Sequence, residues 1–455
     1  MYMRRLFFFA LLLSSLIANA QQEDSIFIKR ISDEIFINGK AYDNLHELTK
    51  TIGGRLSGSP QMVMAEQWGL KTMQQSGADK AWLQECQVPH WVRGGKDEAT
   101  ATVNKKKTKL NVLALGNSIG TDGKKLNAGV ILVNSFDDVE AKKDELKGKI
   151  VFYNYKFNPT FVSPFQAYGD AVRYRGQGPS RAAKYGAVAV IVRSMSHGMN
   201  NYPHTGATRY DSAYAKIPAL AIGLRDADWL DEQLKKAAVT ISLKTNAHFL
   251  ADTTGHNVIG ELTGSEFPDQ YITVGGHLDS WDPAEGAHDD GTGVVQTMEI
   301  LRTFKALGYK PKHTIRFVLF ANEENGLRGG TKYAEEAKSK KEKHIFALES
   351  DAGGFTPRGF GFNATDEQVS KAQKWSILLA PYSGGTLVKG GDGADIGPLQ
   401  RTFNMPAAGL NPDPQRYFDY HHAANDVFEN VNKRELELGA INMAALIYLV
   451  DKYGL

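Results

Sequence analysis

Cysteine is nearly absent from this 455-residue chain, since Cys86 is the only one. A single cysteine forms neither an intramolecular disulfide nor a cysteine-based zinc site, so stability must come from the core or from a metal held by other residues. An excess of charge is lacking as well, because 53 lysines and arginines oppose 51 aspartates and glutamates, a net charge of +2. This balance gives no general affinity for phosphates, and we expect no nucleic-acid partner.

Apolar runs of membrane-spanning length are also lacking, since nothing after residue 20 approaches the roughly 20 apolar residues that a span needs. The first 20 residues differ from the rest: arginines precede an apolar run over residues 6–17, and Ala18-Asn19-Ala20 follows it. A basic start, a short apolar core and an Ala-x-Ala site predict a cleavable signal peptide over residues 1–20. We therefore expect a secreted or periplasmic protein that begins at Gln21 and has no membrane partner.

The residue pattern of the chain changes twice, near residue 112 and near residue 250. Residues 41–76 predict two helical segments separated by a Gly- and Pro-containing loop. Short β-type runs with few long helical patterns fill residues 112–246 and predict a separate β-rich unit. Beyond residue 250, strand, loop and helix patterns alternate, which favours an α/β unit with a mostly parallel sheet. We therefore predict an α/β catalytic domain in two parts, 21–111 and 247–455, with residues 112–246 inserted between them.

Metal-ligand residue types follow three predicted strands of the last part. In open α/β sheets, functional residues gather at the carboxyl ends of the strands. Several imidazole and carboxylate groups are therefore expected to meet at one edge of the sheet. The strand at 271–274 leads to His277 and Asp279, that at 316–320 to Glu323 and Glu324, and that at 345–348 to Glu349 and Asp351.

Two further segments offer ligands. A Gly-flanked acidic turn contains Asp289 and Asp290, and a carboxylate held at such a turn can bridge two cations. Near the C-terminus, His421 and His422 are the only paired histidines in the chain. The residues alone do not decide which member of either pair is the ligand.

A two-zinc site explains why these residue types occur together. Zinc accepts imidazole and carboxylate ligands, and two zinc ions roughly 3.5–4 Å apart hold an attacking water and a substrate oxygen. The side chains of Glu323 and Glu324 point in different directions, so one can bind metal while the other accepts a proton. Asp279 can orient the imidazole of His277 from behind. By contrast, His46-Glu47-Leu48-Thr49-Lys50 lacks the second histidine of a one-zinc protease helix.

At these residues the chain resembles the dinuclear-zinc exopeptidase family, which includes bacterial leucyl aminopeptidases and glutamate carboxypeptidases, and within it the plasma glutamate carboxypeptidase (carboxypeptidase Q) group. The resemblance extends from about residue 40 to the C-terminus. Its motifs are Gly54-Arg55-x-x-Gly58-Ser59-Pro60, Gly276-His277-Leu278-Asp279-Ser280, Asn322-Glu323-Glu324 and Glu349-Ser350-Asp351-Ala352-Gly353.

The resemblance implies two Zn²⁺ ions per chain and a role for each site residue. His277 and Asp351 would bind one zinc, Glu324 and His422 the other, and Asp289 both, with Glu323 as general base and Asp279 behind His277. Asp289 is preferred to Asp290 because the family's Gly-Ala-x-Asp pattern ends there. His422 is preferred to His421 because the family has an acidic residue four positions after the ligand, which here is Asp426.

The resemblance also implies an architecture: a phosphorylase/hydrolase-like catalytic domain with a mixed central sheet, and a protease-associated domain at 112–246. Pro203-His204-Thr205-Gly206 and the loop Gly390–Asp395 resemble segments that shape the substrate cleft, and homodimers are usual in this group. We expect a zinc-dependent metallo-exopeptidase that hydrolyses dipeptides or short peptides. An aminopeptidase acting on longer peptides and a non-catalytic binding protein of the same fold remain alternatives. A single-zinc glutaminyl cyclase is disfavoured because all five ligands are present.

Overall fold

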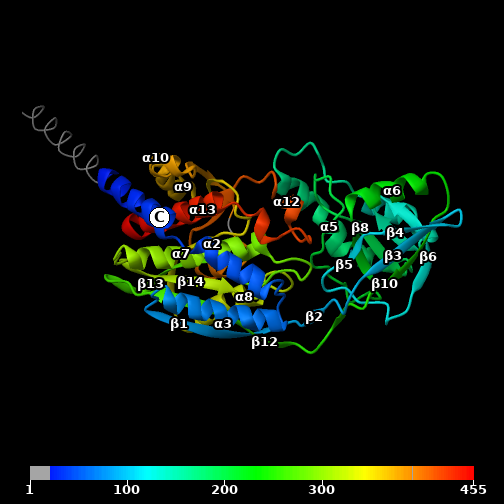
Figure 1. The fold of residues 1–455 in the computed structure, drawn as a ribbon, viewed down its shortest axis with the longest axis horizontal. Coiled ribbons are helices and arrows are strands. Elements are labelled where there is room, and N and C mark those ends of the chain that lie inside the picture. The colour runs from blue at the N-terminus through cyan, green and yellow to red at the C-terminus, as the bar shows by residue number, and fades with distance from the viewer. Residues whose placement is uncertain (1–20, 392) are drawn as a thin grey trace, which may run out of the picture.

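The computed structural model describes residues 21–391 and 393–455, so the predicted signal peptide lies outside the described residues. The chain forms two lobes, each built on an eight-stranded sheet (Figure 1). The N-terminal helix at residues 21–38 and the C-terminus lie in the first lobe. No helix in the described part of the chain is long and apolar enough to cross a membrane.

The first sheet is mixed. Its four central strands, β14, β13, β15 and β18, are parallel to one another. At one edge β12 is antiparallel to both β14 and β1, and toward the other edge β16 is antiparallel to β18. Strand β14, most of β15 and the part of β13 from Ile272 onward are buried, which explains their continuous apolar sequences. In spatial order the strands are β1 (Lys80–Val88), β12 (Thr253–Leu262), β14 (His313–Phe320), β13 (Phe267–His277), β15 (Lys343–Glu349), β18 (Ala407–Pro412), β16 (Pro357–Asn363) and β17 (Thr386–Lys389).

Helices cover both faces of this sheet. One face carries the larger core, to which helix 21–38, α2 (Ala41–His46), α3 (Pro60–Gln75), α7 (Thr292–Ala306) and α13 (Lys433–Tyr453) contribute. The other face carries a smaller core beneath α8 (Arg328–Ser339) and α11 (Gly397–Phe403). The Gly-Ser-Pro motif starts α3: the Ser59 hydroxyl accepts a hydrogen bond from the Met62 N–H at 3.1 Å, and Pro60 occupies the first turn. The two predicted helical segments around this loop are present.

The second sheet is inserted between β1 and β12 of the first. Its strands β6 to β9 are parallel, and the others are antiparallel to their neighbours. A two-stranded ribbon, β2 (Trp91–Val92) with β11 (His248–Phe249), joins the two chain crossings between the lobes. In spatial order the strands are β4 (Lys106–Leu110), β3 (Glu98–Val103), β10 (Thr240–Lys244), β6 (Leu126–Val133), β7 (Ile150–Tyr153), β8 (Ala189–Arg193), β9 (Ala219–Ile222) and β5 (Val112–Ala114).

This second lobe differs from the β-rich unit that the sequence predicts. It contains α4 (Phe136–Ala141), the 20-residue helix α5 (Pro164–Ala183) and α6 (Leu224–Leu234), so it is an α/β unit. The three glycines and the internal Pro179 of α5 lower its intrinsic helix propensity, which concealed it in the sequence. The sheet also begins at β3, before residue 112, because β3 and β4 pair with β10. The domain boundaries themselves stay a prediction.

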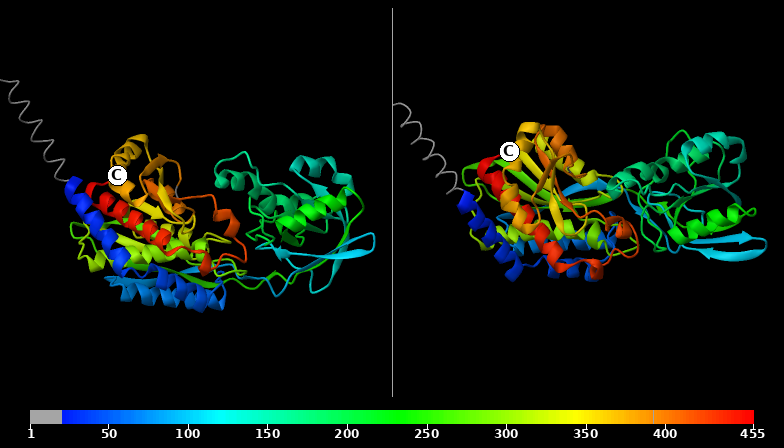
Figure 2. Two further views of the ribbon diagram at one scale, coloured as in Figure 1. Left: turned by 45° about the horizontal axis from the view of Figure 1, so that its top comes forward. Right: turned by 90° about the horizontal axis from the view of Figure 1, so that it is seen from above.

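In Figure 2 the two lobes face each other, with α5 and the loops of the second lobe opposite α12 (Tyr417–Tyr420) of the first. Aromatic contacts join the facing surfaces, since Phe165 of α5 stacks on Tyr417 and Tyr168 stacks on Phe418. The carboxyl ends of the central strands of the first sheet open toward this junction.

Candidate active site

Three parallel strands deliver the predicted ligands to one edge of the first sheet. His277 is the last residue of β13, Glu323 and Glu324 follow β14, and Asp351 follows β15. Within the sheet His277 lies opposite Phe320 of β14, and Gly275 lies opposite Glu349 of β15. This register places the four side chains at neighbouring strand ends, as the sequence predicts.

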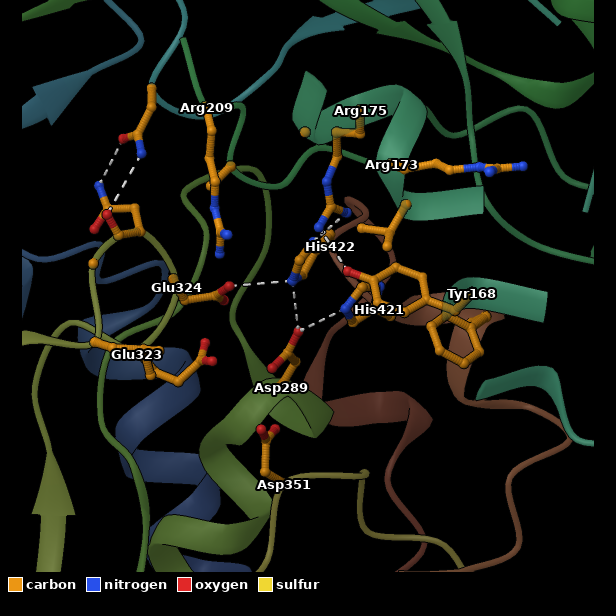
Figure 3. Close-up of a pocket in the computed structure, with 18 of the residues that line it drawn as sticks. Tyr168, Arg173, Arg175, Arg209, Asp289, Glu323, Glu324, Asp351, His421 and His422 are labelled. Atoms are coloured by element: carbon orange, nitrogen blue, oxygen red, sulfur yellow. Dashed lines mark hydrogen bonds and ion pairs between the residues drawn. The ribbon is translucent and has the colours of Figure 1, made fainter. Parts of the chain in front are cut away.

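Asp289 lies between His277 and His422, and Figure 3 shows its contact with His422. Its Oδ1 is 3.2 Å from Nε2 of His277, and its Oδ2 is 3.2 Å from Nε2 of His422. On the two outer sides, Asp351 Oδ1 lies 3.4 Å from Nε2 of His277 and Glu324 Oε2 lies 3.1 Å from Nε2 of His422. One carboxylate therefore faces two groups of ligand atoms with its two oxygens.

Asp290 is buried like Asp289, but its carboxylate oxygens have different partners. Its Oδ2 accepts the backbone N–H of His277 at 3.1 Å, and its Oδ1 accepts the N–H of Gly293 at 2.9 Å. Asp290 thus ties the end of β13 to the start of α7. Because both of its oxygens are occupied by backbone donors, the geometry favours Asp289 as the carboxylate shared between the two histidines.

The two adjacent histidines, His421 and His422, also differ in their contacts. Nε2 of His422 faces both Asp289 and Glu324, whereas Nε2 of His421 lies 3.8 Å from Asp289. His421 packs edge-on to Tyr168 and Phe418 and stacks on His422, with ring centroids 3.5 Å apart. The surroundings of His421 are those of a packing residue.

Asp279 lies next to His277, and its backbone carbonyl and its side-chain carboxylate have different partners. Nδ1 of His277 lies 3.0 Å from the backbone carbonyl of Asp279, while the nearer carboxylate oxygen is 3.8 Å away. Donation of the Nδ1 hydrogen to that carbonyl leaves Nε2 with a free lone pair, the form a metal needs. The Asp279 carboxylate instead accepts the N–H of Glu323 at 3.0 Å, so it fixes the backbone of the proposed base.

Glu323 stands apart from the ligand contacts and lines the central cavity. Burial raises the pKa of its carboxyl well above the usual range, and the negative charges of Asp351 and Glu324 act in the same direction. A carboxyl with a raised pKa and no ion pair in the described residues can take up a proton and release it again.

Asp426 fixes the turn that carries Asp289. Its two carboxylate oxygens accept the N–H groups of His288, at 2.7 Å, and of Asp289, at 3.1 Å. His288 itself stacks on Phe355 and so acts in packing. The sequence pattern marks Asp426 only by its distance from His422, whereas the structure shows that it connects the two ligand segments.

Arg55, from the Gly-Arg motif, is fully buried behind the site without a carboxylate partner at ion-pair distance in the described part of the chain. Its guanidinium donates to the backbone carbonyls of Leu278 at 2.5 Å, Glu285 at 2.7 Å and Gly286 at 3.1 Å. Burial lowers its pKa to about 10, which leaves it charged at neutral pH. Arg55 therefore joins the loop of His277 to the turn of Asp289, a role that the motif does not reveal.

The ligand atoms fit a metal centre. Nε2 of His277 and Oδ2 of Asp289 are buried, yet neither forms a hydrogen bond within residues 21–391 and 393–455. Possible ligand atoms form two groups without a common residue, and within each group they lie within 4.8 Å of one another: Asp289, His421 and His422 in one, and His277, Asp290 and Asp351 in the other. Two imidazoles with carboxylates on each side form a donor set that zinc prefers.

A cavity of about 690 Å³ opens beside these residues and is bounded by both lobes. Among the five predicted ligands Asp351 is the most accessible, with 22% of its side chain exposed. From the second lobe Arg175 and Arg209 reach into the cavity (Figure 3). Arg209 has no ion-pair or side-chain hydrogen-bond partner among the described residues, so its guanidinium is free to meet a ligand.

Three segments with unassigned roles lie around this cavity. His204 is buried beside Arg175 and His421, and burial lowers its pKa to about 3. The Gly390–Asp395 loop borders a second cavity of about 800 Å³ that shares Asp351 with the first, although residue 392 of that loop lies outside the described residues. Gly116-Asn117-Ser118-Ile119-Gly120 fits the pattern of a serine-hydrolase nucleophile, but Ser118 is completely buried in a loop.

Comparison with known proteins agrees with this geometry. Residues 257–447 match peptidase family M28. The chain is 35% identical to carboxypeptidase Q of Homo sapiens over 412 residues, which cover 90% of this chain and 85% of the relative. It is also 35% identical to carboxypeptidase Q of Xenopus laevis over 92% of this chain and 88% of that one.

Comparison with solved structures also finds peptidases. The peptidase M28 precursor from Shewanella amazonensis superposes with a TM-score of 0.89 at 32% identity, over 95% of this chain and 97% of that chain. An aminopeptidase from Aneurinibacillus sp. strain AM-1 shares the fold, with a TM-score of 0.63 at 22% identity over 93% and 95% of the two chains. Fold and site together define a zinc metallo-exopeptidase. More particularly, the chain belongs to peptidase family M28, as its motifs predict.

The contacts of Arg55 predict that this side chain stabilises the loops around the site. Arg55→Lys keeps the charge but cannot reach three separate carbonyls, so at least one buried acceptor loses its donor. We expect a loss of about 1–3 kcal/mol in the free energy of unfolding, measured by urea denaturation of the chelator-treated protein. Arg328→Lys, at an exposed position, is the control and should change it by less than about 0.5 kcal/mol. Equal stability of the two variants would contradict the role given to Arg55.

Proposed function

We propose that this chain is a two-zinc exopeptidase that hydrolyses dipeptides or short peptides. The observation that carries the proposal is the position of Asp289, whose two oxygens face His277 and His422 at equal distances of 3.2 Å. A carboxylate in that position is suited to holding two cations together. Glu323 lies beside them without a ligand contact, as a general base requires.

The chain's own side chains would hold the ions in two overlapping sets. His277 and Asp351 would bind one zinc and Glu324 and His422 the other, with Asp289 common to both. When bound, such a pair of zinc ions supplies Lewis-acid polarisation of the peptide carbonyl and increases the acidity of a water molecule. The bound cations would also offset the negative charges that burial makes costly in this site.

Glu323 would carry the proton. Its carboxylate accepts a proton from the water that attacks the scissile carbonyl and then donates it to the departing amine. The hydrogen bond from the Glu323 N–H to Asp279, at 3.0 Å, fixes the backbone from which this carboxylate extends. Asp279 would thereby serve both the proposed base and, through its carbonyl, the proposed ligand His277.

We attribute the proposed preference for short substrates to the walls of the cavity. We propose that the second lobe is the protease-associated domain and that it limits the length of peptide on its side of the metal centre. The free guanidinium of Arg209 would bind the terminal carboxylate of a short peptide there. The amino-acid pattern of residues 1–20 supports export to the periplasm or the medium, and a homodimer remains a prediction.

Glu323→Gln tests the base directly. The amide keeps the shape of the side chain but cannot accept the proton, so we expect kcat on a dipeptide to fall by about 10²–10⁴-fold. Zinc content, measured by elemental analysis, should stay that of the wild type because Glu323 contacts no metal in this scheme. Glu335→Gln, at an exposed position, is the matched control. A fully active Glu323→Gln variant would show that another group is the base.

Arg209→Met tests the substrate end of the cavity. We expect KM for a dipeptide to rise by about tenfold or more, with kcat changed less, since a charge-assisted hydrogen bond is worth roughly 1.5–3 kcal/mol. A C-terminally amidated dipeptide should be a poor substrate for the wild type and insensitive to the substitution. If amidated dipeptides and tetrapeptides are cleaved as well as free dipeptides, the chain is an aminopeptidase acting on longer peptides.

A further inference from the structure

The two lobes meet at a proposed metal ligand. His422 belongs to the first lobe and Thr205 to the second, and the N–H of Thr205 donates to the carbonyl of His422 at 2.9 Å. The carbonyl of Thr205 in turn lies 3.3 Å from Nδ1 of His422. Two polar contacts, one to the backbone carbonyl and one to the ring of His422, thus join this residue to the second lobe, and both His422 and Thr205 are buried.

This contact selects a form of the imidazole. A neutral histidine carries one ring hydrogen, and a carbonyl at Nδ1 accepts it there, which leaves the lone pair on Nε2. Nε2 is the atom that faces Asp289 at 3.2 Å and Glu324 at 3.1 Å. The second lobe therefore favours the tautomer and the ring orientation that a metal on Nε2 requires.

Arg175 of α5 fixes the accepting carbonyl. Its Nη1 donates to Thr205 at 3.2 Å, and its Nη2 donates to the hydroxyl of Tyr168, on the same helix, at 2.6 Å. The guanidinium is buried and lies within 3.4 Å of Nδ1 of His422. Gly206 has a φ of +116°, and a side chain there would collide with Arg175 and His422, so glycine is needed for this close approach.

We propose that Arg175 is a positioning residue of the second lobe, which acts through the Thr205 carbonyl to orient His422 for zinc. The inserted lobe then completes one of the two zinc sites in addition to shaping the cleft. The effect is specific to one site, because His277 gets the corresponding support from Asp279 within its own lobe, with Nδ1 3.0 Å from that carbonyl. This inference rests on the proposed function, since it takes His422 as a zinc ligand.

The proposed role of Arg175 is tested by measuring zinc binding to the substrate-free full chain. Chelator-competition titrations are made on the wild type, Arg175→Met, Arg173→Met and His422→Ala, with thermal unfolding of each zinc-free form alongside. Arg173 is the matched control, since it lies on the same helix and lines the same cavity but pairs with Asp170 at 3.6 Å. We expect two tight zinc ions in the wild type and in Arg173→Met, and one in His422→Ala.

For Arg175→Met we expect one zinc to bind 10–100-fold more weakly while the other keeps the wild-type affinity. Wild-type affinity for both ions would overturn the inference and leave the proposed function intact. Equal weakening of both ions, together with a lowered unfolding temperature of the zinc-free form, would also overturn it, because Arg175 would then act only on general stability. A wild type that binds fewer than two zinc ions would overturn the proposed function and the inference together.

Discussion

The repulsion among buried carboxylates is the constraint on which this site depends. Burial opposes the negative charges of Asp290, Glu324, Asp351 and Asp426, whereas the contacts of Asp289 with His277 and His422 hold the pKa of its carboxyl well below the usual range. Burial raises the pKa of Glu324 and of Asp426 to about 7 and that of Asp290 well above its usual range. Ionised carboxylates are stable at such density only beside compensating positive charge. Two divalent cations would supply that charge where the ligand atoms converge.

The fold prepares this arrangement with backbone contacts as well as with side chains. Parallel strands β13, β14 and β15 bring their carboxyl ends together, and Asp290 ties the end of β13 to α7. Arg55 and Asp426 both secure the turn of Asp289, the first through backbone carbonyls and the second through N–H groups. The proposed ligands are therefore oriented by groups that need not touch the substrate or a metal. Rigid support of this kind is what a reactive centre requires to keep its geometry.

Much of this could be predicted from the sequence, because strand ends are recognisable. His277, Glu323, Glu324 and Asp351 each follow an apolar run, and the rule that parallel strands share one functional edge was enough to bring them together. The choice between adjacent residues of the same type needs more than the position of the strand ends. Asp289 and Asp290, like His421 and His422, are chemically alike, so only the family pattern separated them before the structure showed their different partners.

Other features could not be predicted, because they depend on contacts between residues far apart in the chain. The three carbonyls around Arg55 and the meeting of Thr205 with His422 have no local signature. Helix α5 was concealed by its glycines and proline, and tertiary packing outweighs their low helix propensity. The second lobe therefore proved to be α/β, and its contribution to the site became visible only in three dimensions.

The most direct measurement of the central claim is the zinc content of the purified chain and of its Asp289→Asn variant. A carboxamide in place of the shared carboxylate removes one negative charge and one of the two ligand oxygens while leaving the size of the side chain almost unchanged. The account predicts two zinc ions per wild-type chain and the loss of at least one in the variant. Two zinc ions retained at wild-type affinity by Asp289→Asn, or fewer than two in the wild type, would contradict it.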